Sequence, residues 1–138
     1  MSTERIVHNV PEPVREIELR VFKDSRGKLL PIEKAAGNLP FDPVRIFFIR
    51  DVPGGISRGN HAVDCRLFIM VLEGSAVLTE YRGPEMIPWE LHPGKGLLIP
   101  EQRFIVISEF MPDTILAVFA SKRFNETRYF DFTEVKTA

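Results

Sequence analysis

Residues 58–74 read Arg-Gly-Asn-His-Ala-Val-Asp-Cys-Arg-Leu-Phe-Ile-Met-Val-Leu-Glu-Gly, and this stretch decides the predicted fold class. Polar residues around His61 are followed by an unbroken apolar run from Leu67 to Leu72, which stops at Glu73-Gly74. A run of this length bounded by turn residues predicts a strand that is buried on both faces. We expect His61 to lie in a polar turn at the mouth of this strand, at the rim of a barrel, with its side chain facing a cavity.

The flanking sequence predicts further short strands separated by glycine and proline. Before the stretch, they are Glu16–Phe22, Lys28–Glu33 after a tight turn at Asp24–Gly27, and Val44–Val52. After it, they are Ser75–Tyr81 as a hairpin partner, Met86–Leu91, Leu97–Pro100, Arg103–Phe110 and Thr114–Ser121. This spacing predicts an all-β sandwich or barrel, and the apolar central strands and short turns favour a closed double-sheet jelly roll.

The chain length of 138 residues suits a single domain. We expect residues 1–16 to form an N-terminal arm or an edge strand. Residues 17–138 then form the jelly-roll domain, which ends in an aromatic tail over residues 122–135. The tail is predicted to contain a turn of helix followed by a strand.

Composition excludes several classes of function. The formal net charge is −1 and the Lys and Arg residues form no cluster, so we expect no nucleic-acid partner. No apolar run approaches the roughly 18 residues of a membrane span, and residues 1–10 lack the apolar core of a signal peptide. Cys65 is the single cysteine, so no disulfide framework is expected. From these features we expect a cytoplasmic protein.

An ordered set of short motifs resembles the sugar-nucleotide 3,4-ketoisomerases, which are small cupins that act on dTDP-4-keto-6-deoxyglucose. The motifs are Asp24-Ser25-Arg26-Gly27-x-Leu29, Ile32-Glu33, Pro40-Phe41, Arg45-Ile46, Arg58-Gly59-x-His61-Ala62, Gly74-Ser75, Gly96-Leu97-x-Ile99-Pro100 and Ala120-Ser121. The resemblance covers roughly residues 17–133. It implies a cupin-type double-stranded β-helix, a homodimer, no metal or other cofactor, and a nucleotide-linked ketosugar bound in the barrel mouth during deoxysugar and surface polysaccharide biosynthesis.

The sequence departs from the pattern of this family at three usually polar positions. They are occupied here by Val63, Leu67 and Ile105, so the expected barrel is more apolar. Two functions therefore remain open. One is an isomerase acting on a dTDP-linked 4-keto-6-deoxyhexose, and the other is a non-catalytic cupin that binds a sugar nucleotide or another small molecule. A purely structural role is a third possibility.

Moving a carbonyl from C4 to C3 requires a base near pKa 7 and a donor for the enediolate oxygen. His61 matches a catalytic position of the family and has the chemistry of such a base. The alternative for His61 is a turn histidine that caps a strand end. Asp64 and Tyr81 are the candidates for the second catalytic group, with Glu80 beside Tyr81 as a further possibility.

Substrate-binding candidates are the arginines near turns and strand starts, because a guanidinium fork matches phosphate oxygens. They are Arg26, Arg45 and Arg58, together with Asn60 beside the histidine. Solvated turn positions are the alternative for Arg26 and Arg58, and an ion pair with Asp42 or Glu33 is the alternative for Arg45. Phe47, Phe48 and Trp89 could stack on a nucleobase or belong to the core.

A metal site is not expected. The three histidines are His8, His61 and His92, and they lie in different parts of the sequence. Val63 removes the second histidine of a His-x-His pair, and a transition metal needs three or four converging ligands.

Overall fold

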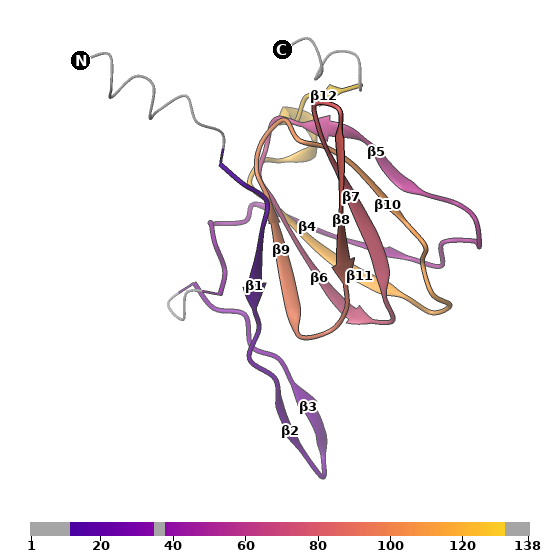
Figure 1. Cartoon of the computed structure of the whole chain (residues 1–138). Helices are drawn as coiled ribbons and strands as arrows, with labels where there is room; N and C mark the ends of the chain where they lie inside the picture. The colour runs from indigo at the N-terminus through magenta and orange to yellow at the C-terminus, as the bar shows by residue number, and fades with distance from the viewer. Residues whose placement is uncertain (1–11, 35–37, 132–138) are drawn as a thin grey trace.

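The computed structural model describes residues 12–34 and 38–131, which form two facing antiparallel sheets and one projecting hairpin (Figure 1). Sheet I has the strand order β1 (Arg15–Glu18), β9 (Lys95–Ile99), β6 (Leu67–Glu73), β11 (Ile115–Ala120) and β4 (Arg45–Arg50). Sheet II has the order β12 (Tyr129–Phe130), β5 (Arg58–Val63), β10 (Phe104–Ser108), β7 (Ala76–Arg82) and β8 (Glu85–Leu91). The hairpin consists of β2 (Phe22–Asp24) and β3 (Gly27–Leu29). This arrangement confirms the predicted all-β jelly roll.

The apolar run at the centre of the sequence is strand β6, in the middle of sheet I. Its residues alternate between two hydrophobic clusters, because successive side chains of a strand point to opposite faces. Leu67, Ile69 and Val71 pack between the two sheets, whereas Phe68 and Met70 pack on the outer face of sheet I. All five are buried, which confirms the prediction of a strand buried on both faces, except that Leu72 at the end of the run is 48% exposed.

The outer face of sheet I is covered by a segment that was predicted to be regular strand. Instead of continuing to Glu33, β3 ends at Leu29, and Leu30 and Ile32 pack against the outer cluster. The predicted strand over residues 16–22 is likewise divided into β1 and β2, because the intervening Leu19 is buried in that same cluster. Burial of these side chains against sheet I therefore stabilises the chain more than a longer, continuous hairpin would.

The prediction for His61 was wrong in one respect. His61 lies inside strand β5, not in a turn, and β5 and β6 belong to different sheets. Residues 64–66 carry the chain from sheet II to sheet I.

Ser75–Tyr81 was predicted to be the hairpin partner of the apolar strand, and this is also wrong. The segment forms β7, which pairs with β8 and β10 in sheet II. Gly74 has φ +83° and its Cα lies against Thr114, whose Oγ1 accepts a hydrogen bond from the Ser75 amide at 3.1 Å. A side chain at Gly74 would collide with Thr114, and this tight passage turns the chain into the other sheet.

The tail folds as predicted, as far as the structure describes it. A 3₁₀ turn, η1 (Phe124–Glu126), precedes β12, which pairs with β5 at the upper edge of sheet II in Figure 1. Residues 1–11 of the predicted N-terminal arm and residues 132–138 of the tail lie outside the described residues. Within the described ranges, no helix has the length and apolarity required to cross a membrane.

Candidate functional site

A pocket of about 170 Å³ opens between the two sheets at the end where β4, β5 and β12 meet. Its walls are mostly aliphatic, with side chains from β4, β5, β6, β10 and β11. The polar side chains that line it are Arg45, Arg58, His61 and Tyr129. An apolar cavity with a few convergent polar groups is the usual form of a small-molecule site.

Arg58 and His61 face the same pocket because β5 contains a β-bulge. His61 is opposite Ile105 and Arg58 is opposite Ile107, with a shift of register between them. Asn60, at φ +61°, is the extra residue, and in a regular strand Arg58 and His61 would point to opposite faces. Gly59 has φ +87°, and a Cβ there would lie 3.0 Å from the Ile105 carbonyl oxygen, so the bulge favours glycine.

His61 is held as a neutral base. Its Nδ1 atom is buried and has no hydrogen-bond partner within the described structure. Burial lowers the pKa of His61 below its ordinary value, an interaction with its own backbone opposes that shift, and the positive charge of Arg58 lowers the pKa further. The imidazole therefore carries a free lone pair near neutral pH.

Arg45 and Arg58 place positive charge at the pocket. Arg45 lies over the rings of Phe47 and Phe124, at 5.1 and 5.7 Å, and its Nε atom is buried without a hydrogen bond. In the described part of the chain, neither arginine forms an ion pair. The ion pair of Arg45 with Asp42 or Glu33, which was the alternative for this arginine, does not form within the described structure, and Asp42 pairs with Lys34 at 2.8 Å. Two arginines without carboxylate partners make the pocket suitable for an anionic ligand.

Two of the predicted binding residues lie elsewhere in this chain. Arg26 is at the tip of the β2–β3 hairpin, where its side chain is 88% exposed and pairs with Asp24 at 2.7 Å. Asn60 is exposed, does not line the pocket, and donates a hydrogen bond to Ser57 Oγ at 3.2 Å.

Tyr81 and Asp64, predicted as catalytic, also lie outside the pocket lining. Tyr81 alternates with the core-facing Glu80 on β7, so it lies on the outer face of sheet II, edge-on to Phe104 at 5.4 Å. Asp64 holds the C-terminal segment: its carboxylate accepts a hydrogen bond from the Arg128 amide at 2.8 Å and pairs with Lys122 at 3.3 Å. The Arg128 amide is the main reason why the pKa of Asp64 is lowered.

Tyr129 is the pocket residue that the sequence did not single out. Its ring is nearly perpendicular to the His61 ring, with centroids 4.9 Å apart. Tyr129 lies in an aromatic tail far along the chain from His61, and only the pairing of β12 with β5 brings the two together. Alternation in the tail offers no signal for that pairing, because β12 has only two residues.

The three positions that depart from the family pattern all face the pocket. Val63, Leu67 and Ile105 line it with aliphatic side chains. Of the aromatic candidates, Phe47 lines the pocket, whereas Phe48 is exposed on the outer face of sheet I. The pocket is accordingly apolar apart from its arginines, His61 and Tyr129.

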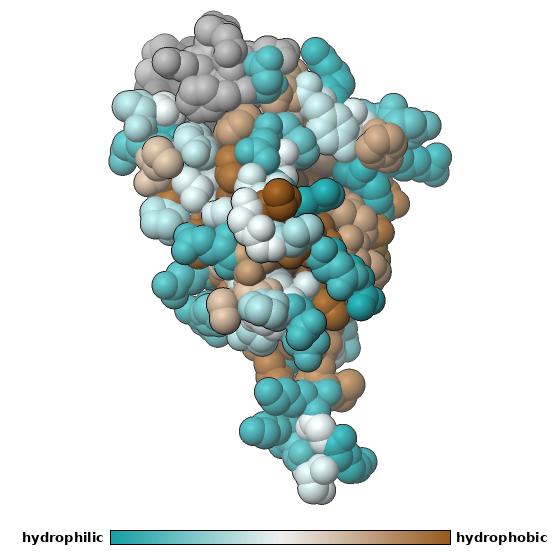
Figure 2. Space-filling model, turned by 90° about the vertical axis from the view of Figure 1, so that its right-hand side faces the viewer, coloured by the Kyte–Doolittle hydropathy of each residue, from teal (hydrophilic) through white to brown (hydrophobic). Residues whose placement is uncertain are grey.

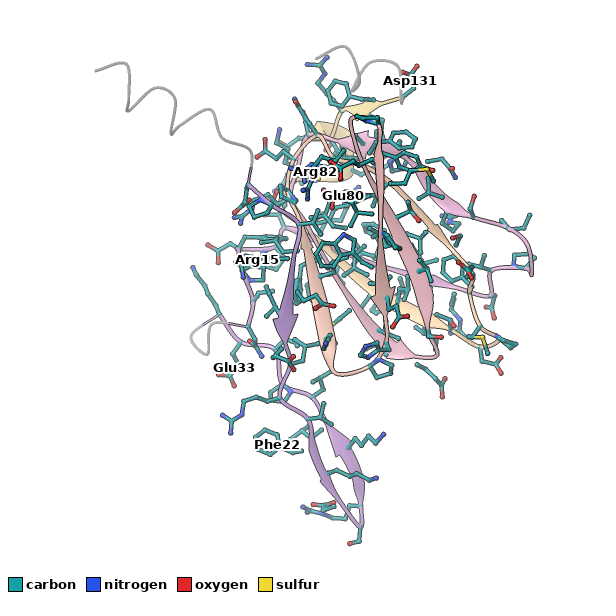
Figure 3. The ribbon with its side chains drawn as sticks, viewed as in Figure 1. Arg15, Phe22, Glu33, Glu80, Arg82 and Asp131 are labelled. Carbon is teal, nitrogen blue, oxygen red and sulfur yellow. The ribbon has the colours of Figure 1, made fainter. Side chains whose placement is uncertain are left out.

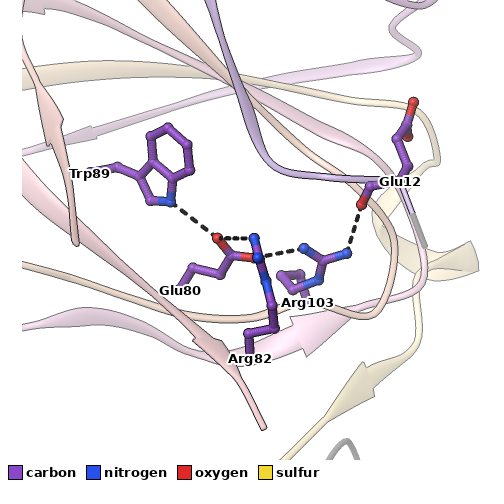
Figure 4. Close-up of polar contacts among 5 residues, drawn as sticks. All are labelled: Glu12, Glu80, Arg82, Trp89 and Arg103. Atoms are coloured by element: carbon purple, nitrogen blue, oxygen red, sulfur yellow. Dashed lines mark hydrogen bonds and ion pairs between the residues drawn. The ribbon is translucent and has the colours of Figure 1, made fainter. Parts of the chain in front are cut away.

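A second polar cluster, centred on the buried Glu80, contains no residue of the pocket lining (Figure 4). Glu80 is opposite Ile105 on β7, and its fully buried carboxylate accepts hydrogen bonds from Arg103 at 2.6 Å and from Trp89 Nε1 at 3.1 Å. Arg82 approaches the same carboxylate at 3.3 Å, and Figure 3 shows Glu80 and Arg82 together in the upper part of the sandwich. Trp89 is therefore a core residue and not a stacking surface for a nucleobase. Glu80, considered as a catalytic candidate, is occupied by this cluster.

Neither a metal centre nor a nucleophilic thiol is seen among the described residues. No three His, Cys, Asp or Glu side chains converge there. Cys65 is fully buried, and burial raises the pKa of its thiol, so it is not activated as a nucleophile.

Comparison with known proteins identifies the family. The family described as FdtA, WxcM-like, C-terminal, matches residues 12–136. The chain belongs to this family. It is 30% identical over 116 residues to TDP-4-oxo-6-deoxy-alpha-D-glucose-3,4-oxoisomerase of Aneurinibacillus thermoaerophilus, a match that covers 82% of both chains.

Solved structures of 3,4-ketoisomerases have the same fold. A mutant of QdtA from Thermoanaerobacterium thermosaccharolyticum, in complex with TDP-4-keto-6-deoxyglucose, is 28% identical, with a TM-score of 0.83 over 90% of this chain and 91% of QdtA. A 3,4-ketoisomerase from Helicobacter canadensis is 26% identical, with a TM-score of 0.81 over 90% and 95% of the two chains. The chain is thus a cupin of a family of sugar-nucleotide isomerases, as its motifs predicted.

Proposed function

We propose that this protein is a 3,4-ketoisomerase that converts a dTDP-linked 4-keto-6-deoxyhexose to the 3-keto sugar. The observation that carries the proposal is His61, a neutral imidazole in an apolar pocket beside two arginines that form no ion pair with any described residue. The name of the Aneurinibacillus thermoaerophilus relative and the ligand of the QdtA mutant both specify TDP-4-keto-6-deoxyglucose, which supports this substrate.

In this reaction, His61 removes the proton from C3 and returns it to C4 on the same face of the enediol. A depressed pKa keeps the imidazole unprotonated before the first step, as a general base requires. Arg45 and Arg58 bind the diphosphate, and their charge also favours the negative charge that develops on O4 as the C3 proton leaves. The aliphatic walls exclude water and so strengthen both interactions.

The absence of a polar atom at Val63, Leu67 and Ile105 favours the second candidate, a cupin that binds a sugar nucleotide without converting it. Both candidates use the same pocket and the same arginines. They differ in whether His61 exchanges protons with the ligand.

The deciding experiment follows the ligand by proton NMR in deuterated water, with dTDP-4-keto-6-deoxyglucose and purified protein. The isomerase incorporates deuterium at the reacting carbons and forms a 3-keto product, and His61→Asn abolishes both while still binding the nucleotide. Binding by the wild type without exchange or product would refute the isomerase and leave the binding module. Arg58→Gln should weaken binding of dTDP itself, which tests the anion site separately.

We also propose that the protein is a homodimer that buries the exposed apolar face of β4. Ile46 and Phe48 are 53% and 59% exposed, on the outer face of sheet I at its edge. They lie beside Phe119 and Ala117 of β11 and continue the hydrophobic surface of the outer cluster. The hairpin carries further exposed apolar side chains, Phe22 among them (Figure 3).

The shape of the hairpin supports a second copy of this chain as the occupant of that face. Figure 2 shows a narrow projection with hydrophilic residues at its tip and hydrophobic ones nearer the body. Two such copies can cover each other's apolar surfaces around a two-fold axis. Sedimentation should show that Phe48→Glu lowers the dimer fraction, whereas Met86→Glu, at an equally exposed apolar site on sheet II, leaves it unchanged. A monomeric wild type would refute the dimer.

We place this reaction in the cytoplasm, in the synthesis of deoxysugars for surface polysaccharides. The support is the activity of the relatives and a single, buried cysteine, which fits a reducing compartment.

A further inference from the structure

The short strand β12 places a tyrosine directly across from the apolar position that follows His61 in the pocket. Tyr129 is opposite Val63 in the register of β12 with β5, and both residues line the pocket. The Tyr129 ring packs edge-on against the His61 ring, at 84° and 4.9 Å between centroids. β5 thus supplies the imidazole, and β12 supplies the ring of a tyrosine in contact with it.

Isomerisation of a 4-ketose to a 3-ketose moves two protons, and His61 accounts for one of them. The proton on C3 must reach C4, and the hydroxyl proton on O3 must in effect pass to O4. The second transfer needs a group that can both donate and accept a proton. Arg45 and Arg58 cannot accept one, because a guanidinium has no acceptor atom, whereas a phenol hydroxyl can do both.

We propose that Tyr129 is the second catalytic residue, which handles the oxygen-bound proton while His61 handles the carbon-bound one. The inference rests on the proposed ketoisomerase function. In the first step, His61 takes the C3 proton as Tyr129 gives its hydroxyl proton to O4, which forms the neutral enediol, imidazolium and phenolate. In the second step, the phenolate takes the O3 proton as the imidazolium protonates C4. The products are the 3-ketose and both side chains in their starting forms.

Asp64 is the positioning residue for Tyr129. Its backbone amide donates to the Arg128 carbonyl at 3.2 Å, and its carboxylate accepts from the Arg128 amide at 2.8 Å. Lys122, at the start of the tail, pairs with the same carboxylate at 3.3 Å. These contacts fasten the residue next to Tyr129 to the end of β5, so that the tyrosine ring is held edge-on to His61.

The test compares Tyr129→Phe with Tyr81→Phe, a matched removal of a hydroxyl from the outer face of sheet II. Tyr129→Phe keeps the ring contact with His61 and removes only the proposed acid and base. We expect kcat to fall by about 10²-fold or more, in the range of a lost acid–base or oxyanion group, with little change in KM. Tyr81→Phe should leave kcat unchanged.

Two further readouts separate catalysis from structure. The acid limb of the kcat/KM profile reports His61, so it should stay at the same pH in Tyr129→Phe, whereas a displaced histidine would shift it. Deuterium incorporation at C3 should slow together with product formation, because C3 deprotonation depends on proton donation to O4.

The outcomes distinguish a failure of the Tyr129 proposal from a failure of the proposed ketoisomerase function. If the wild type isomerises the sugar and Tyr129→Phe does so at the same rate, Tyr129 has no catalytic role and the ketoisomerase stands. If the wild type binds the nucleotide sugar but shows no exchange, the proposed function fails, and the role of Tyr129 fails with it. A large loss in Tyr129→Phe with an unmoved acid limb supports both.

Discussion

Replacing Arg103 by methionine should destabilise the fold strongly, because it leaves the buried Glu80 carboxylate without its main counter-charge. Glu80 is 0% exposed, the Arg103 side chain is 12% exposed, and their N–O distance is 2.6 Å. Breaking a buried pair by removing one partner costs about 3–5 kcal/mol. Trp89 and Arg82 remain beside the carboxylate, so we expect the lower end, about 3 kcal/mol.

Arg82 provides the matched control for this prediction. It approaches the same carboxylate at 3.3 Å, but its side chain is 51% exposed, so solvent screens the pair. Arg82→Met should therefore cost less than about 1 kcal/mol. The difference between the two costs reports the effect of burying the arginine, because both variants remove one arginine from the same carboxylate.

The assay is urea unfolding at one fixed protein concentration, since a dimer would make the midpoint depend on concentration. With an m-value of about 2 kcal/mol/M, Arg103→Met should lower the midpoint by about 1.5 M. The double variant Glu80→Met, Arg103→Met should be more stable than Arg103→Met alone, because no unpaired charge remains. The reasoning is refuted if Arg103→Met costs no more than Arg82→Met, or if the double variant loses the sum of its single costs.

Other perturbations test the site and the packing. The kcat/KM of the wild type should rise with pH through an apparent pKa below about 6.5, because burial and Arg58 favour the neutral base, and Arg58→Gln should move this limb to higher pH. The free energy of unfolding should fall as the pH drops from about 6.5 through that lower pKa, because His61 binds a proton more readily in the unfolded chain than in the folded one. In urea titrations, His61→Asn should remove this part of the pH dependence. Gly96→Ala would drive a Cβ into the buried ring of Phe68, at a cost of about 1–3 kcal/mol, and thermal unfolding should show partial recovery in the double variant with Phe68→Leu. Asp64→Ala should lower kcat by loosening Tyr129, whereas dTDP affinity, measured by calorimetry, should change little.

Much of the fold follows from short-range patterns in the sequence. The apolar run at residues 67–72 specifies a strand that is buried on both faces from Leu67 to Val71, and the glycine- and proline-rich turns delimit most of the other strands. These features are visible without the structure because alternation and turn chemistry act over a few residues. The motif around His61 likewise predicted two residues that line the pocket, His61 and Arg58.

The partners of those strands were decided by the tertiary structure. Nothing local distinguishes pairing of β7 with β6 from its pairing with β10, and the passage at Gly74 against Thr114 selects the second. The same holds for the site: Arg58 faces the pocket with His61 only because the bulge at Asn60 adds a residue to β5.

Tyr129 and Asp64 show most clearly what the sequence alone does not predict. Asp64 is close to His61 in sequence yet binds the tail, and Tyr129 is distant in sequence yet contacts His61. The sequence by itself determined most of the strands, the histidine that lines the pocket and the family. The polar groups that surround His61 are brought there by long-range strand pairing. The stability of that pairing comes from packing and hydrogen bonds between segments far apart in the chain, so only the folded molecule decides which groups meet.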